Sequence, residues 1–521
     1  MNWSNTKKYT IMIIISFGSL LYAAVLAPLL SPALVIIAIQ FGKEVGDITV
    51  ISGYMLLVTA ASGPIVCACS RKYGKRPLLI LSSIFGLVGT IVGSAVNSYD
   101  GLLAARIIQG GSMYILFLYI DFCSKLMPHS SAFESLVISL IGDLFFVHQR
   151  GYFMTLIQFI LGAASNFSAI IVGPIATNLG WRYLFHILIA FTALETVLLV
   201  LFVPETNYNR DHRYDIDELA DDNLASLAAV EKRHARQSPD STTKDLTNDG
   251  ITRFETNTSS PPTYGPKKTF VQELAVFTGT YSNDNLLQLF IAPFAVCANV
   301  AVLWVIVVTG GLTAFFVAQS YDMAQIFMFP PYNLDAAGVG YLSVGPFLGG
   351  LLGSVILGGT LDPLIKWCAK KNGGIYEPEY RLLGMIPALL IGVGLFAFGY
   401  MCENHYSYYA TATMHGMDLF GIVCAAISAS AYAIDAYRDM SSEIFIVNMV
   451  FKNLLFYGFS YFVNDWTAKK GPAVVFYTFG GIGFAMVATT PVFFFWGKRY
   501  RSFWHRHNLL EKWGVRTHAE I

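Results

Sequence analysis

Ionisable side chains inside long apolar runs are the first candidates for chemistry in this sequence. Glu134 and Glu195 stand within such runs, Asp435 ends another, and Lys452 and Asn453 lie together in a fourth. A charged group in apolar surroundings is costly, so it normally faces a partner or a water-filled cavity. Carboxylates in such a place bind cations or exchange protons, and an amide adds hydrogen bonds. We therefore take these five residues as candidates for a binding site.

Two of these acids have competing interpretations. Asp435 follows a run of small residues and lies close to Arg438, Asp439 and Glu443, so an ion-pair cluster at a helix end also explains it. Glu195 fits a packing role and a binding role equally well. Glu134 has no partner nearby in the sequence, which favours a functional role.

The motifs of soluble enzymes are missing. The sequence has no Gly-x-Ser-x-Gly, no His-Glu-x-x-His and no phosphate-binding loop. Its seven cysteines include several in or beside apolar runs, without the spacing of metal ligands. We expect no enzyme activity, no metal and no cofactor.

Composition indicates the elements that must position these residues. The 521 residues are 55% hydrophobic and 13% charged, and the mean hydropathy is +0.53. A helix needs roughly 20 apolar residues to cross a bilayer, and the chain offers about a dozen such runs. Backbone groups in lipid must be satisfied internally, so these runs predict an all-α membrane protein with about twelve spans.

A change in composition divides the chain into parts. Residues 207–284 are rich in charged, Ser, Thr, Asn and Pro residues without apolar periodicity, so they predict a mostly disordered linker on the cytoplasmic side. The predicted parts are a six-helix bundle at 1–206, this linker, a second six-helix bundle at 285–497, whose first span is expected near 290–319, and a basic cytoplasmic tail at 498–521.

Residues 114–130 break the pattern of the first half. If the apolar segments on both sides of them crossed the membrane, the number of spans would be odd, and the basic tail would lie outside. We interpret 114–130 as an insertion, which is either a lengthening of the fourth span or an error in the gene model.

Basic loops predict the orientation. Lys and Arg in short loops are retained on the cytoplasmic side. The turn Ser70–Pro77 carries four cationic side chains, and Lys366, Lys370 and Lys371 mark a second such loop. With the basic tail, these charges predict that both ends of the chain are cytoplasmic.

Two motifs connect this layout with a known family. Lys72-Tyr-Gly-Lys-Arg-Pro77 resembles the loop between the second and third helices of major facilitator superfamily transporters, and Arg106-Ile-Ile-Gln109-Gly110 resembles another motif of that superfamily. Gly173-Pro174 is similar to a fragment of its antiporter motif. The resemblance implies two six-helix halves with the substrate bound between them. It also implies roles in gating for a set of residues: Arg71, Lys72, Gly74, Lys75, Arg76, Arg106, Gln109, Gly110, Gly173 and Pro174.

Further matches resemble the fungal drug:proton antiporter branch, and within it the members similar to the yeast polyamine and cation transporter Hol. They include Tyr332-Asn333 and Phe451-Lys-Asn453. This resemblance implies that Glu134 points into the central cavity. One departure is Arg71, where the superfamily normally has an Asp. Our hypothesis is that Asp143 pairs instead with Arg71 or Arg76 at the inner gate.

The function expected from these features is transport by alternating access. A cavity lined by Glu134, Asp435, Trp304 and Tyr332 suits a small organic cation of the polyamine type through charge pairing and cation–π contacts. Each positive charge that enters the cell gains ~2.3 kcal/mol per 100 mV of inside-negative potential, which favours uptake of cations. The alternative is a proton-coupled exporter of drugs or metabolites, and a third interpretation is a sensor that moves nothing. We expect a plasma-membrane monomer that contacts substrate, protons and lipid but no nucleic acid.

Overall fold

The computed structural model describes residues 3–110, 132–145, 153, 155–206, 270–277, 279–281, 285–437, 440–507 and 509–513. The predicted insertion 114–130 and most of the predicted linker lie outside these residues. The chain divides into two compact units, one of which joins Met1–Asn207 to Leu274–Ile521, while the other is Tyr208–Glu273. Helix α11, Phe270–Glu273, is the described part of the smaller unit.

The first half of the larger unit contains only helices among its described residues. They are α1 Asn5–Gly18, the π-helix η1 Ser19–Val25, the 3-10 helix η2 Pro28–Ala33, α2 Leu34–Phe41, α3 Val45–Tyr73, α4 Arg76–Ala95, α5 Tyr99–Gly110, α6 Ala132–Leu144, the π-helix η4 Ile160–Ala164, α8 Ser165–Asn178 and α9 Arg182–Phe202.

The second half is helical in the same way. Its elements are α12 Leu286–Ala295, η6 Val296–Ala298, α13 Val300–Phe327, α14 Ala336–Leu342, α15 Val344–Lys371, η7 Pro378–Met385, η8 Pro387–Leu389, α16 Leu390–Glu403, α17 Tyr408–Ala436, α18 Ser441–Ser460, α19 Val463–Lys470, α20 Pro472–Ala488, α21 Thr490–Arg506 and α22 Leu509–Lys512.

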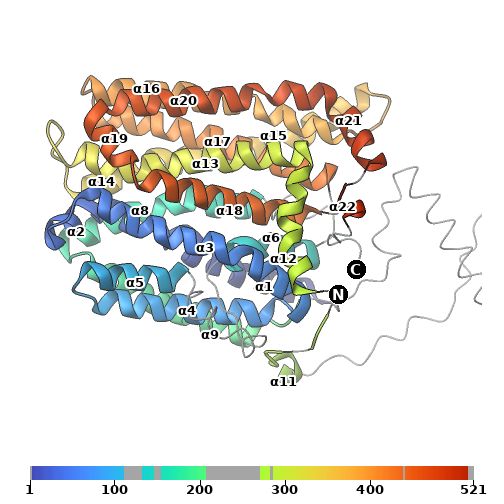
Figure 1. Cartoon of the computed structure of the whole chain (residues 1–521), viewed down its shortest axis with the longest axis horizontal. Helices are drawn as coiled ribbons and strands as arrows, with labels where there is room; N and C mark the ends of the chain where they lie inside the picture. The colour runs from blue at the N-terminus through green and yellow to red at the C-terminus, as the bar shows by residue number, and fades with distance from the viewer. Residues whose placement is uncertain are drawn as a thin grey trace, which may run out of the picture. The chain divides into compact units, whose positions relative to one another are not determined.

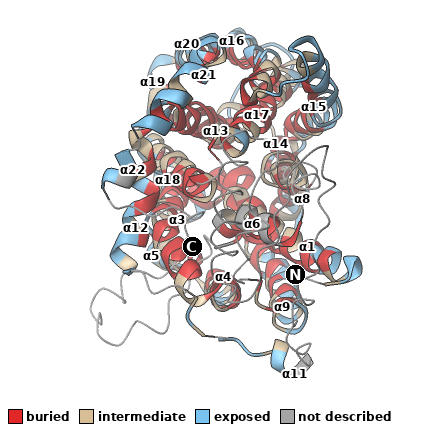
Figure 2. Cartoon of the chain, turned by 90° about the vertical axis from the view of Figure 1, so that its right-hand side faces the viewer, coloured by how far each residue is buried: buried red, intermediate tan, exposed pale blue. Residues whose placement is uncertain are grey.

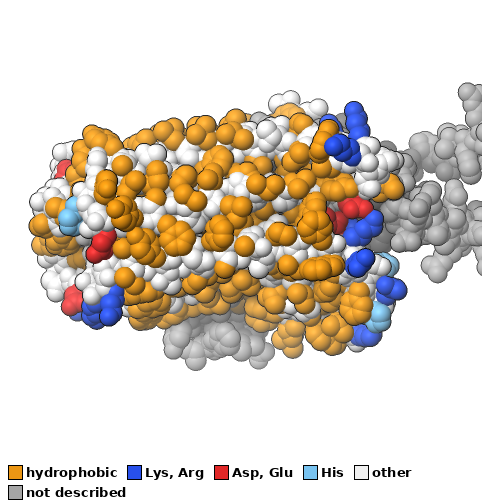
Figure 3. Space-filling model, turned by 90° about the horizontal axis from the view of Figure 1, so that it is seen from above, with side chains coloured by type: hydrophobic (Ala, Val, Ile, Leu, Met, Phe, Trp, Pro, Cys, Tyr) orange, Lys and Arg blue, Asp and Glu red, His pale blue; other side chains and the backbone are white. Residues whose placement is uncertain are grey.

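The predicted all-α membrane fold is confirmed. The described residues contain ten helices long and apolar enough to cross a membrane, or eleven if α18 and α19, which are bent by 47°, form one span. The expected fourth span is divided between α5 and α6, and residues 111–131 between them lie outside the description. Figure 3 shows apolar side chains along the middle of the visible face and charged side chains at its two ends, as a bilayer-spanning surface requires.

The seventh span begins later than the sequence predicted. We expected it near residue 290, but α13 starts at Val300 because the side chain of Asn299 caps its backbone, accepting from Ala301 N at 3.0 Å and Val302 N at 3.3 Å. The apolar residues before this cap form α12, which packs against α3 and α18 and runs across the bundle instead of along it (Figure 1).

The two halves meet along α3 and α18 and along α8 and α14 (Figures 1 and 2). The second contact depends on the predicted motif residue Gly173, since a Cβ there would lie 2.5 Å from Ala336 O. Figure 2 shows that the most buried residues lie at the centre of the bundle, where the halves face each other. The start of α1 and the end of α21 lie at one end of it (Figure 1), beside the basic turn between α3 and α4.

Candidate functional site

A cavity of about 210 Å³ lies between the two halves. The first half contributes residues from η1, η2, α6, η4 and α8, and the second half contributes residues from α13, α17 and α18. Most lining side chains are apolar, with a few polar groups among them, which is the usual character of a site for an organic molecule. The polar or charged members include Glu134, Gln158, Ser165, Asn166, Thr309, Thr313, His415, Ser430, Asn448, Lys452 and Asn453.

One ion pair joins the two halves inside this cavity. Lys452 of α18 donates from Nζ to Oε1 of Glu134 on α6, and the two side chains are 22% and 15% exposed. Sequence reasoning found both residues, but it did not pair them, because they are 318 positions apart. The pair balances the charge of Glu134, so this acid is not an isolated negative charge.

Two polar side chains of the cavity have no hydrogen-bond partner within the described part of the chain. The amide of Asn453 is completely buried, and the ring of His415 is 1% exposed. Buried polar groups in proteins are nearly always bonded, so two unpaired groups beside one cavity are unusual. Asn453 was a predicted site residue. His415 was missed, although it stands in an apolar run and the rule that selected Glu134 would have found it.

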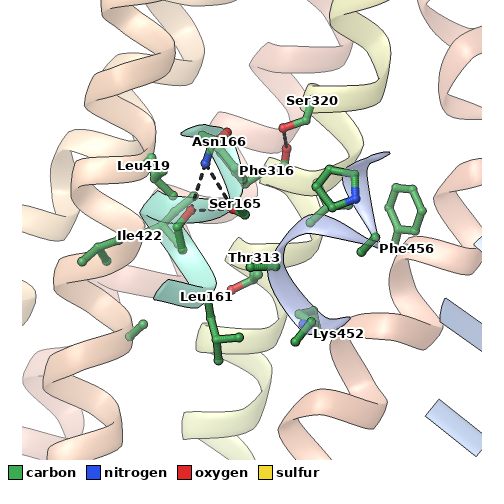
Figure 4. Close-up of a pocket in the computed structure, with 18 of the residues that line it drawn as sticks. Leu161, Ser165, Asn166, Thr313, Phe316, Ser320, Leu419, Ile422, Lys452 and Phe456 are labelled. Atoms are coloured by element: carbon green, nitrogen blue, oxygen red, sulfur yellow. Dashed lines mark hydrogen bonds between the residues drawn. The ribbon is translucent and has the colours of Figure 1, made fainter. Parts of the chain in front are cut away.

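Two π-helical turns form part of the cavity wall. η1 contributes Ala23 and Ala24, η4 contributes Leu161 and Gly162, and the two turns pack against each other. Such turns widen the helix and occur often at functional sites. Beside η4, Asn166 donates from Nδ2 to Gly162 O at 2.9 Å (Figure 4).

Neutral hydrogen bonds close the end of the cavity that lies away from the basic turn. Ser31 Oγ donates to Ser320 O at 2.7 Å, and Tyr321 O–H donates to Ala27 O at 2.7 Å. Ser31 lies in η2 and Ala27 directly before it, whereas Ser320 and Tyr321 lie in α13, so both bonds join the halves. Pro28 begins η2 and Pro32 lies inside it, which explains why the long first apolar run is not one continuous helix.

The predicted motif around Arg106 points into the bundle. Its side chain is completely buried and donates from Nη1 to Leu26 O at 2.7 Å and to Gln109 Oε1 at 3.2 Å. A Cβ on Gly110 would lie 2.5 Å from Met55 O, so only glycine permits this approach of α5 to α3. The motif therefore positions α5 against η1 and α3, next to the cavity.

The basic turn is held by two acids that sequence reasoning did not assign to it. Arg71 forms a buried ion pair with Glu443 of α18. Glu205 accepts from the backbone N–H groups of Lys75 at 3.0 Å and Arg76 at 3.1 Å.

Two further features complete the turn. Gly74 has φ +96°, a left-handed conformation that favours glycine, and a Cβ there would lie 2.3 Å from Glu205 Oε2. Lys72 O accepts from Tyr281 N at 2.8 Å. The side chain of Asp143 lies outside the described ones, so its pairing with Arg71 or Arg76 stays a prediction. The gating roles of Gly173 and Pro174, which lie in α8, stay predictions as well.

Asp435 does not lie in the cavity, contrary to the expectation. It lies at the end of α17, where it accepts from Arg381 Nε at 2.8 Å and from the hydroxyl of Tyr376. Burial and the neighbouring Asp435 carboxylate raise the pKa of Tyr376, which keeps this hydroxyl a donor. The structure therefore agrees with the alternative of an ion-pair cluster at a helix end, with Arg381 as a partner.

Three other expected site residues also lie elsewhere. Trp304 donates from Nε1 to Thr489 Oγ1 at 2.7 Å and stacks on a neighbouring ring. Tyr332 donates its hydroxyl to Tyr406 O at 2.8 Å, and Asn333 is an exposed turn residue with φ +49°. These residues were chosen by type and resemblance, which do not fix the direction of a side chain.

Glu195 is completely buried within the first half but does not line the cavity. Neither carboxyl oxygen has a hydrogen-bond partner among the described residues. A Cβ on Gly18 of α1 would lie 2.8 Å from Glu195 Oε1, so the acid lies against the backbone of α1. The predicted binding role of Glu195 has no support from the cavity.

Comparison with protein families gives two matches. The model of the Major Facilitator Superfamily matches residues 129–459, and that of the fungal trichothecene efflux pump matches residues 24–230. Among solved structures, the xylose transporter XylE from E. coli, in a partially occluded inward open conformation, superposes with a TM-score of 0.56. It is 13% identical, and the match covers 93% of this chain and 99% of XylE. This likeness shows the fold alone.

Individual relatives are fungal. An MFS-type transporter of Schizosaccharomyces pombe is 23% identical over 82% of this chain and 74% of its own. Protein HOL1 of Saccharomyces cerevisiae is 30% identical over 33% of this chain and 30% of its own. A probable efflux pump, mfs2, of Aspergillus flavus is 22% identical over 91% of this chain and 99% of its own.

Proposed function

Since the chain belongs to the Major Facilitator Superfamily, and is therefore a secondary transporter and not an enzyme, we propose that it exports an organic metabolite in exchange for protons. The efflux-pump model that matches its first half and the efflux pump that it resembles over most of its length support export. The observation that carries the proposal is the ion pair between Glu134 and Lys452, which joins the halves inside the cavity.

The pair offers a simple mechanism of exchange. Alternating access requires the halves to move apart at one end of the cavity and then at the other. A substrate with a cationic or donor group replaces Lys452 at the carboxylate of Glu134. A proton on Glu134 removes the charge that holds the substrate. Because substrate and proton compete for the same carboxylate, binding of one releases the other.

The cavity also suggests the kind of substrate. Its apolar lining, which includes Phe316, Leu419 and Phe456, favours a molecule with an apolar body. Asn453 and His415 also line the cavity, and their side-chain polar atoms have no hydrogen-bond partner among the described residues. Uptake of a polyamine has less support, because Lys452 balances the negative charge that would attract a di- or trication and the match to HOL1 covers a third of the chain.

Transport by a strain that expresses the protein tests this proposal. Cells are loaded with fluorescent organic cations, neutral fungal metabolites or labelled spermidine, and retention is measured with and without a protonophore. Export predicts lower retention than in the parent strain, and the protonophore should remove the difference. Higher retention of spermidine would instead support polyamine uptake and overturn the proposal.

The variant Glu134→Gln sharpens the test. It keeps the shape of the side chain but cannot release a proton, so proton-driven export should fall to the background. Asp465→Asn is the matched control, because it removes the acid of an exposed ion pair with Lys469 on the surface of α19. Unchanged export by Glu134→Gln at normal expression would refute the role of Glu134.

A further inference from the structure

A second group of buried polar side chains lies in the second half, beside the cavity. His415 and Asp418 are three positions apart on α17, and Gln319 and Asp322 are three positions apart on α13, so each pair shares one face of its helix. Asp418, Gln319 and Asp322 are completely buried. This group contains acids, but no cationic side chain is paired with them among the described residues.

Asp418 and Gln319 form an incomplete hydrogen-bonded pair. Gln319 Nε2 donates to Asp418 Oδ2 at 3.1 Å. The second carboxyl oxygen, Asp418 Oδ1, and the amide oxygen, Gln319 Oε1, have no donor in the part of the chain that the structure describes. The fold makes room for this acid, because a Cβ on Gly394 of α16 would lie 1.9 Å from Asp418 Oδ1.

One proton completes the pair. An ionised carboxylate without a cation is costly at such a depth. A carboxylic acid can donate its O–H to Gln319 Oε1 while Gln319 Nε2 donates to its second oxygen, so both unpaired acceptors are satisfied at once. We propose that Asp418 is a proton-binding site of the transport cycle, distinct from Glu134. This inference rests on the proposed proton-coupled export and adds the place where the proton is held within the second half.

Polar groups lead from this site in both directions. On one side, His415 lies in the cavity wall one helical turn from Asp418. On the other, Asp322 accepts from Thr467 Oγ1 and from Asn464 Nδ2, the latter at 3.3 Å. Asn464 lies in α19, at the end of the bundle opposite the basic turn (Figure 1). These polar groups therefore lie between that end of the bundle and the cavity.

The charged and titratable groups around Asp418 are few. α13 brings Tyr321 and Asp322, α16 brings Cys402 and Glu403, and α17 itself brings His415. The remaining neighbours of α17 carry their groups elsewhere. α14 has Tyr341. In α15 and η7, Asp362 pairs with Arg381 and Glu379 pairs with Arg501, and the lysines of α15 lie in its last turns. α18 has Glu443 and Lys452, each in an ion pair, and Tyr457, which bonds to Tyr461.

The test uses purified full-length protein in liposomes with a substrate found in the retention assay. Two transport modes are compared, which are exchange of labelled for unlabelled substrate without a pH gradient and uphill transport driven by one. A gradient of about one pH unit is worth about 1.4 kcal/mol per proton, or about tenfold accumulation. For Asp418→Asn, which keeps a donor for Gln319 but cannot bind a proton, exchange should persist and the tenfold accumulation should disappear.

Two outcomes distinguish a failure of the proposed proton coupling from a failure of the inference about Asp418. If the wild type shows exchange but no accumulation with the gradient, the proposed proton coupling fails. If the wild type accumulates substrate and Asp418→Asn does so equally, the inference about Asp418 is overturned.

A second variant covers the case in which Asp418→Asn does not fold. Gln319→Met removes the amide that bonds to the carboxyl group of Asp418, so the pH profile of gradient-driven transport should shift relative to the wild type. An unshifted profile would contradict the proposal. His186→Gln, an exposed change on α9 in the other half, is the control for both variants.

Discussion

The two ends of the contact between the halves are closed by different chemistry. Next to the basic turn, α3 and α18 are joined by the buried ion pair of Arg71 and Glu443. At the opposite end, η2 and α13 are joined by neutral bonds, in which Ser31 and Tyr321 donate to backbone carbonyls. Removing one partner of a buried ion pair leaves an uncompensated charge, whereas the loss of one neutral hydrogen bond costs only about 1 kcal/mol. The two closures should therefore differ strongly in sensitivity to mutation.

The largest effect is expected for Glu443→Gln, which breaks the charged closure. It leaves Arg71, which is 7% exposed, without this counter-charge, and should lower the free energy of unfolding by about 3–5 kcal/mol. Thermal unfolding in detergent can be followed with a thiol-reactive dye, because Cys67, Cys69 and Cys402 are buried and free. The double variant Arg71→Met with Glu443→Gln should recover most of the loss. An unchanged melting temperature for the single variant would contradict the comparison.

A smaller effect is expected for Glu205→Gln, which loosens the basic turn without touching the ion pair. The two carboxylate oxygens of Glu205 accept from the backbone N–H groups of Lys75 and Arg76 in the turn, and Gln keeps only one acceptor oxygen. Hydrogen bonds to charged groups are worth ~1.5–3 kcal/mol, so a loss of about 2 kcal/mol should appear in the same melting assay. A loss as large as that of Glu443→Gln would show that the turn, and not the ion pair, dominates this end.

The smallest effect is expected at the neutral closure. Tyr321→Phe removes the hydroxyl that bonds to Ala27 O but keeps the ring, so the expected loss is about 1 kcal/mol. Its main effect should be on the transport cycle, since a weaker closure favours opening at that end. Labelling of a cysteine introduced at Ser320 should become faster in Tyr321→Phe than in the parent with the same cysteine. Equal labelling rates would remove the gating role of this bond.

Composition and charge could predict much of the fold. The apolar runs predicted the helical spans, and the resemblance of the residues around Arg71 and Arg106 indicated the family, which the comparisons confirm. Span limits were less accurate. Helix α13 begins at Val300, ten residues after the start expected near 290, because the side chain of Asn299 caps its first turn. Hydropathy does not detect such a local hydrogen bond.

Depth in an apolar run selects some residues of the cavity wall and omits others. This rule selected Glu134, Lys452 and Asn453, which line the cavity, while their role in binding stays a prediction. The same rule was not applied to His415 and Asp418. Asp435 was predicted as a site residue because the sequence does not show its partner Arg381, which comes from another helix. Trp304 was predicted as a site residue from its residue type alone.

By itself the sequence determined that the chain is a membrane protein, because it contains about a dozen apolar runs of bilayer length. These runs must be helices, since backbone groups in lipid have to be satisfied within the segment. It also determined which residues are too polar for their surroundings. Only the tertiary structure decided the partner of each. Glu134 pairs with Lys452 and Arg71 pairs with Glu443, across 318 and 372 positions. The physical reason is that a buried charge selects its partner by distance in space, and distances between helices depend on packing, which hydropathy does not encode.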